Sequence, residues 1–90
     1  MQNGVEKAHE GLRNTASFPL ALAGEGEKVR IVHVKNSRML QERLLSMGLH
    51  LEDEIQVVQR QFGGAVLIEK TGSRYAMGGG MAHKISVVRC

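Results

Sequence analysis

Aromatic side chains and cysteines are scarce in this sequence of 90 residues. It holds no Trp, one Tyr (Tyr75) and two Phe (Phe18 and Phe62), too few for the stacked aromatic platforms on which single-stranded nucleic acids bind. Its one cysteine, Cys90, excludes an intramolecular disulfide and a zinc site built on cysteine pairs. A lone thiol suits a reducing compartment, so we expect a cytoplasmic protein.

Long apolar runs and clusters of charge are also missing. The first sixteen residues contain no apolar segment of the secretory type, and no later segment approaches the length that spans a membrane. The formal charge is +3, but Lys and Arg are scattered singly along the chain. The sequence therefore predicts neither direct membrane insertion nor a nucleic-acid partner.

The hydrophobic content of 42% is enough for one compact core. Residues 1–17 show neither helical nor strand periodicity and carry few large apolar side chains, which predicts a flexible N-terminal tail. The folded domain is expected over residues 18–90. It should begin in extended conformation at Phe18, because Pro19 disfavours a helical residue before it.

Short β-branched runs with glycine turns between them predict strands. Residues 28–35 read K-V-R-I-V-H-V-K, and period-two alternation places His33 beside Val29 and Ile31 on one face, half-buried in the barrel. Further strand-like runs cover residues 54–62, 65–70, 70–77 and 85–88. A meander of such strands is expected to close into a small barrel, because closure removes exposed edges.

One helix is expected between the first two long strands, over residues 37–47. Asn36 or Ser37 can cap its start, and Gly48 stands where a left-handed residue ends a helix. Its apolar residues recur at intervals of four and three and so share one stripe: Leu40, Leu44 and Met47. A second helical turn is expected over residues 81–84, after a glycine triplet (78–80) that we interpret as a tight barrel corner rather than an anion site.

The sequence shows no arrangement typical of an enzyme. Catalysis needs a nucleophile beside an orienting base, or two carboxylates held in a cleft. The serines occur in helical or turn contexts and Cys90 lies at the chain end. We therefore expect no catalytic residue, no required cofactor and a non-enzymatic protein.

Weak candidates for metal ligands follow the helix. His50 is close to Glu52 and Asp53, and His83 is a further candidate, which would suit a divalent ion such as ferrous iron. No spaced set of ligands is visible, however, and an acidic stretch after a helix is more often a solvated turn.

The helix also offers candidates for a protein contact. Met39 and Arg43 lie to one side of the apolar stripe, and methionine adapts to irregular partners. An equally good alternative is that Met39 packs over the barrel mouth while Arg43 is solvated.

Four segments of the sequence carry a family pattern. They are residues 20–24 (L-A-L-A-G), 29–32 (V-R-I-V), 43–49 (R-L-L-S-M-G-L) and 78–85 (G-G-G-M-A-H-K-I). With these segments, residues 18–88 resemble the FeoA family, and the R-L-x-x-M-G-L element is the most specific part of the likeness.

This resemblance implies a mainly β fold, a small SH3-like β-barrel with a helical insertion after an early strand and a short C-terminal helical turn. It also implies a non-enzymatic accessory protein of ferrous iron uptake that docks on the cytoplasmic part of FeoB, a membrane permease with a GTPase domain. Such a protein would associate with the inner membrane through its partner. The expected contact residues are Met39, Arg43, Met47, Gly63 and Gly64.

Two further expectations accompany this function. The alternative function is a ferrous iron sensor or chaperone that uses the weak metal candidates. An open strand edge of a small barrel would also permit weak homo-oligomers.

Overall fold

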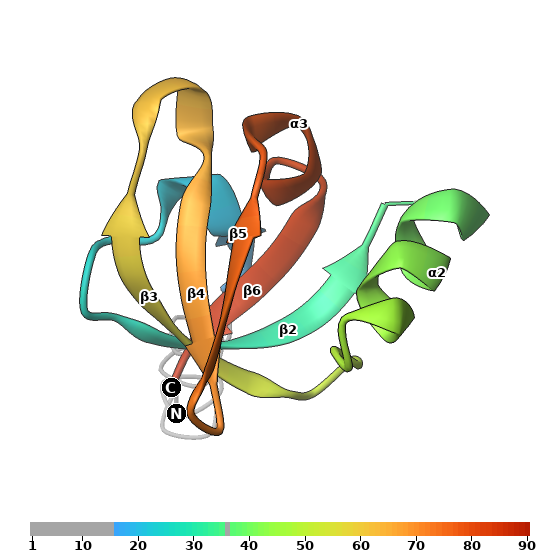
Figure 1. Ribbon diagram of the computed structural model, residues 1–90, viewed down its shortest axis with the longest axis horizontal. Coiled ribbons are helices and arrows are strands. Elements are labelled where there is room, and N and C mark those ends of the chain that lie inside the picture. The colour runs from blue at the N-terminus through green and yellow to red at the C-terminus, as the bar shows by residue number, and fades with distance from the viewer. Residues whose placement is uncertain (1–15, 36) are drawn as a thin grey trace, which may run out of the picture.

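The computed structural model describes residues 16–35 and 37–90 as a six-stranded antiparallel sheet in the order β1-β6-β2-β3-β4-β5. The elements are β1 (Phe18–Pro19), η1 (Leu20–Leu22), β2 (Lys28–Val34), α2 (Arg38–Ser46), β3 (Glu54–Arg60), η2 (Phe62–Gly64), β4 (Val66–Lys70), β5 (Ser73–Met77), α3 (Gly79–Ala82) and β6 (Ile85–Arg89). Figure 1 shows the strands curling around one another, with α2 standing to one side beyond β2 and α3 beside the upper end of β5. The predicted mainly β fold with a helical insertion is confirmed.

The first strand of the described residues, β1, starts at Phe18. Of the predicted tail over residues 1–17, residues 1–15 lie outside the described part of the chain. Within the described residues, no helix has the length and apolar character needed to cross a membrane.

One interior is shared by all the strands. Its largest fully buried side chains come from η1, the five strands β2 to β6 and the segment after α2: Leu20, Val29, Ile31, Leu49, Val57, Val66, Ile68, Met77, Ile85 and Val87. Among the described residues, no polar or charged side chain is buried. Burial of apolar surface therefore holds the barrel closed.

The predicted position of His33 is wrong. The register of β2 against β6 shifts between Ile31 and His33, so that Val32 is an extra residue on β2. A bulge of this kind reverses the alternation of side chains beyond it. His33 is consequently exposed, whereas Val34, expected on the other face, is buried in the core.

The ends of α2 follow the sequence signals closely. The Ser37 hydroxyl accepts a hydrogen bond from Leu40 N at 3.2 Å, which caps the first turn. At the other end Gly48 has φ +79°, its N–H donates to Leu45 O, and Leu49 N donates to Leu44 O at 2.9 Å. This is a Schellman arrangement, and the left-handed residue predicted at Gly48 is confirmed.

Candidate functional site

An open groove of about 600 Å³ lies between α2, β5 and α3. Arg43 and Met47 of α2 line one side of it, and the whole run of residues 74–78 lines the other, with Met81 of α3 at the end. The groove thus contains two of the residues predicted to contact a partner, and it joins segments that are distant in the sequence.

The helix presents these side chains through its periodicity. Met39, Arg43 and Met47 follow one another at intervals of four residues, so they share one face of α2. Met47 is half-buried and packs against the core, while Arg43 is exposed. Met39 is 76% exposed, so it does not pack over the barrel mouth. It extends this face of α2 beyond the groove.

The groove combines apolar and cationic surface. Tyr75 and Met81 are half-buried, and together with Met47 they supply an adaptable apolar surface. Arg74 donates through Nε to Glu69 Oε1 at 3.3 Å, whereas none of the ion pairs between described residues involves Arg43. None of the described residues that line the groove is acidic. The surface is therefore suited to a ligand with apolar side chains and negative charge.

The structure places Gly63 and Gly64 outside this groove. Both have positive φ, +77° and +85°, and they pack against α3, where a Cβ on Gly79 would overlap the carbonyl oxygen of Gly63. The side chain of His83 also lies against Gly64, and its Nδ1 is 2.7 Å from Gly79 O. The close packing of η2 on α3 therefore explains Gly63 and Gly64. It also confirms the tight-corner interpretation of the glycine triplet at Gly79.

The metal candidates do not form one cluster. Asp53 Oδ2 accepts hydrogen bonds from Lys70 Nζ at 2.7 Å and from His50 N at 2.8 Å, and Lys70 Nζ also donates to Gly48 O at 2.6 Å. His83 contacts Gly64, just before β4 begins, whereas Lys70 is the last residue of β4. His83 and Asp53 are therefore at opposite ends of that strand.

Glu52 occupies a turn with φ +75°. In the described part of the chain, no three side chains of His, Cys, Asp or Glu lie together as a metal site would require. Asp53 serves to tie the segment after α2 to the end of β4.

The pairing of Asp53 gives a prediction for stability. The Lys70 ammonium, helped by His50 N–H, holds the pKa of the Asp53 carboxyl below its usual value despite partial burial. A lowered pKa means that the group stabilises the fold above its unfolded pKa of about 3.9, and that this contribution disappears as the pH falls through the lower folded value. We expect Asp53→Asn to lower the free energy of unfolding by about 1 kcal/mol at pH 7, measured by urea denaturation.

Urea denaturation of the same two proteins at low pH checks this role of Asp53. The difference between wild type and Asp53→Asn should shrink below about pH 4 as Asp53 protonates in the wild type. Glu42→Gln is the control, since Glu42 is exposed on α2 and takes part in no ion pair between described residues. A difference that stayed constant down to pH 2 would contradict this role of Asp53.

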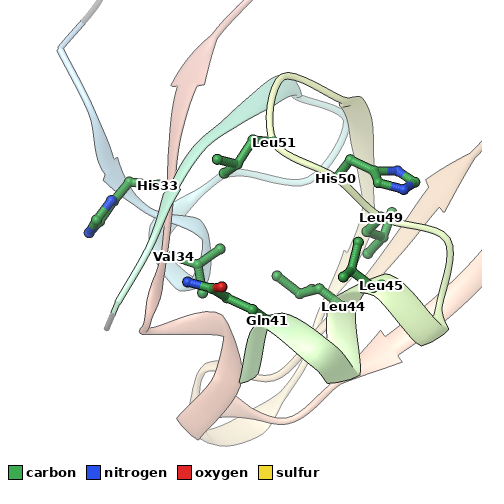
Figure 2. Close-up of a pocket in the computed structure, with 8 residues that line it drawn as sticks. All are labelled: His33, Val34, Gln41, Leu44, Leu45, Leu49, His50 and Leu51. Carbon is green, nitrogen blue, oxygen red and sulfur yellow. The ribbon is translucent and has the colours of Figure 1, made fainter. Parts of the chain in front are cut away.

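A second cavity, of about 230 Å³, lies between α2 and β2. Figure 2 shows aliphatic side chains around it, with the rings of His33 and His50 directed away from its centre. The two histidines therefore do not converge on a ligand there.

The part of the groove that sequence reasoning missed is β5 with Met81. The sequence predicted a strand-like run after β4, but nothing local indicated that this strand faces α2. That proximity arises from the tertiary fold.

Comparison with known proteins agrees with this architecture. The FeoA domain family matches residues 18–89. A protein of Methanocaldococcus jannaschii named Fe(2+) transport protein A is 39% identical over 70 residues, which cover 78% of this chain and 84% of that protein.

Solved structures show the same fold. A crystal structure of an iron uptake regulatory protein (FeoA) is 31% identical with a TM-score of 0.75, over 82% of this chain and 99% of that one. FeoA of Chlorobium tepidum, 19% identical, has a TM-score of 0.70 over 80% of this chain and 70% of that one. A manganese-dependent transcriptional repressor, 18% identical, matches with a TM-score of 0.77 over 84% of this chain but only 43% of its own length, a likeness of fold alone. The SH3-like barrel is thereby confirmed, and the chain belongs to the FeoA family.

Proposed function

We propose that this chain is a non-enzymatic accessory protein of Fe(2+) transport that docks on the cytoplasmic part of the FeoB permease. Family membership and the relative named Fe(2+) transport protein A support the transport role. The permease would bring the chain to the inner membrane. The observation that carries the docking role is the groove between α2 and β5, with its methionines and arginines.

The composition of the groove suits a protein partner better than a small polar ligand. Methionine and tyrosine supply adaptable apolar surface, and Arg is among the residues enriched in protein interfaces. The volume of about 600 Å³ is open to solvent along β5 rather than enclosed. An open, elongated site of this kind accommodates a segment of another chain.

The alternative function, a ferrous iron sensor or chaperone, has less support. Asp53 is already hydrogen-bonded to Lys70 and His50, and His83 lies at the other end of β4. Binding an ion through Asp53 would first require these hydrogen bonds to break. We therefore assign the function to the docking groove.

Replacement of both Met39 and Arg43 by Ala tests this placement. The two side chains are exposed, so the fold should persist, while affinity for detergent-solubilised FeoB of the same organism should fall about tenfold or more, the effect of losing roughly 1.4 kcal/mol of contact. Biolayer interferometry with immobilised FeoB measures it.

The matched control is Leu22→Ala with Lys35→Ala. It also removes one exposed apolar and one exposed cationic side chain, but neither belongs to α2 or lines the groove. Equal affinity of both double variants and wild type would show that the partner does not bind along α2.

A further inference from the structure

The groove runs along the backbone edge of β5. Side chains of a strand alternate between its two faces, so contact with the consecutive residues 74–78 is made from the edge and not from one face. The order of the sheet agrees, because β5 is its last strand and pairs with β4 among the described strands. Figure 1 shows β5 next to β4, with α3 beside its upper end.

The turn before β5 determines which backbone groups point into the groove. Thr71 and Gly72 have φ of +51° and +85°, and Lys70 pairs with Ser73, which defines a two-residue hairpin turn of type I′. The residues flanking such a turn exchange both hydrogen bonds, and hydrogen-bonded pairs then alternate along the ladder. The N–H and C=O groups of Arg74 and Ala76 consequently face away from β4.

The outward N–H and C=O groups of Arg74 and Ala76 are available for hydrogen bonds to another strand. Outside the strand ladders and helices, none of the backbone hydrogen bonds between described residues involves Arg74 or Ala76. Five residues of β5 at about 3.4 Å each extend over about 17 Å, so the edge can pair with a segment of four to six residues.

The two edges of the sheet differ in how they are protected. At the other edge, β1 has two residues, one of which is Pro19, and Arg89 stacks over the Phe18 ring with its guanidinium carbon 4.4 Å from the ring centroid. Short length and proline are common ways to prevent pairing at an edge. The β5 edge contains no proline and is bordered by the apolar and cationic side chains of the groove.

We propose that the β5 edge binds an extended, acidic segment of the partner protein as an additional strand, with its apolar side chains against Met47 and Met81. This inference rests on the proposed function and specifies how docking occurs. Main-chain hydrogen bonds supply affinity in strand addition, and side-chain pockets supply specificity. Negative charge on the segment follows from Arg43 and Arg74, since no described residue lining the groove is acidic.

Charge also argues against a second copy of this chain as the occupant. Pairing of β5 with β5 would bring two grooves together, each with Arg43 and Arg74 and without an acidic lining residue. Like charges in such an interface repel. A partner with acidic residues has no such penalty.

Ala76→Pro tests strand addition directly. Proline removes the N–H of Ala76, which faces away from β4, so no hydrogen bond of the β4–β5 ladder is lost. We expect affinity for detergent-solubilised FeoB to fall at least tenfold. Ala76→Ser, which keeps the backbone donor, should bind within about twofold of wild type.

Hydrogen exchange on the unmodified 90-residue chain gives a second measurement, independent of whether Ala76→Pro folds well. Bound FeoB should slow exchange of the Arg74 and Ala76 amides, with little change at His83. Two results would overturn strand addition and leave the proposed function standing. One is binding of FeoB without this protection. The other is wild-type affinity of Ala76→Pro together with weakened binding of Met39→Ala/Arg43→Ala. Protection that appears without FeoB and grows with protein concentration would assign the edge to a second copy instead, and no binding by wild type would overturn both proposals.

Discussion

The Gly79→Ala variant is expected to unfold roughly 10 °C below wild type. A Cβ on Gly79 would overlap Gly63 O and lie 3.0 Å from Gly63 C. Both are backbone atoms of η2, and Gly63 is itself held at φ +77°, so the clash cannot be relieved by rotating a side chain. Overpacking of this kind costs about 2 kcal/mol, which for a domain of this size corresponds to the stated change in Tm.

Gly80→Ala is the matched control, in the same helical turn. A Cβ on Gly80 meets nothing within 4 Å and its φ is not in the left-handed region. The substitution should therefore leave Tm unchanged or raise it slightly, because Ala restricts the unfolded chain. Calorimetry of both variants measures the difference, and equal Tm values would contradict the close packing of α3 on η2.

Reversal of charge in the groove should have the largest effect on docking. We expect Arg43→Glu with Arg74→Glu to weaken binding to FeoB by about a hundredfold or more, roughly 2.8 kcal/mol, because two attractions to an acidic segment become two repulsions. The loss should be largest at low ionic strength, since salt screens exposed charges. Titrations at two salt concentrations test both parts of the prediction.

The control for charge reversal is Lys35→Glu with Arg38→Glu. It changes the net charge equally, lies outside the groove lining, and places an acid in the first turn of α2, where the helix dipole favours it. Arg74→Glu also replaces the ion pair with Glu69 by a like-charge pair across the hairpin, so thermal unfolding must be checked for each variant. Similar losses in both double variants would indicate a general charge effect and not an acidic segment in this groove.

Features set by local chemistry could be predicted from the sequence. Ser37 and Gly48 delimit α2 because capping depends on a few adjacent residues. The turn at Thr71-Gly72 likewise depends on its own backbone conformation. The positions of β2, β3, β4 and β6 along the chain followed from their β-branched residues.

Features set by distant pairing could not be predicted in the same way. The exposure of His33 depends on a bulge in the register between β2 and β6, which alternation within one strand cannot reveal. The close packing of Gly79 on Gly63 and the proximity of Arg43 to β5 both join segments far apart in the chain. For the candidate site, the sequence indicated the α2 side of the groove, and only the fold revealed its β5 side.

The most direct test of the account is binding of this protein to detergent-solubilised FeoB of the same organism, with and without guanine nucleotide and ferrous iron. We expect saturable binding that Arg43→Glu with Arg74→Glu weakens about a hundredfold or more and that Lys35→Glu with Arg38→Glu preserves. Absence of binding under every condition, or binding that neither variant alters, would contradict the assignment of the groove between α2 and β5 as the docking site.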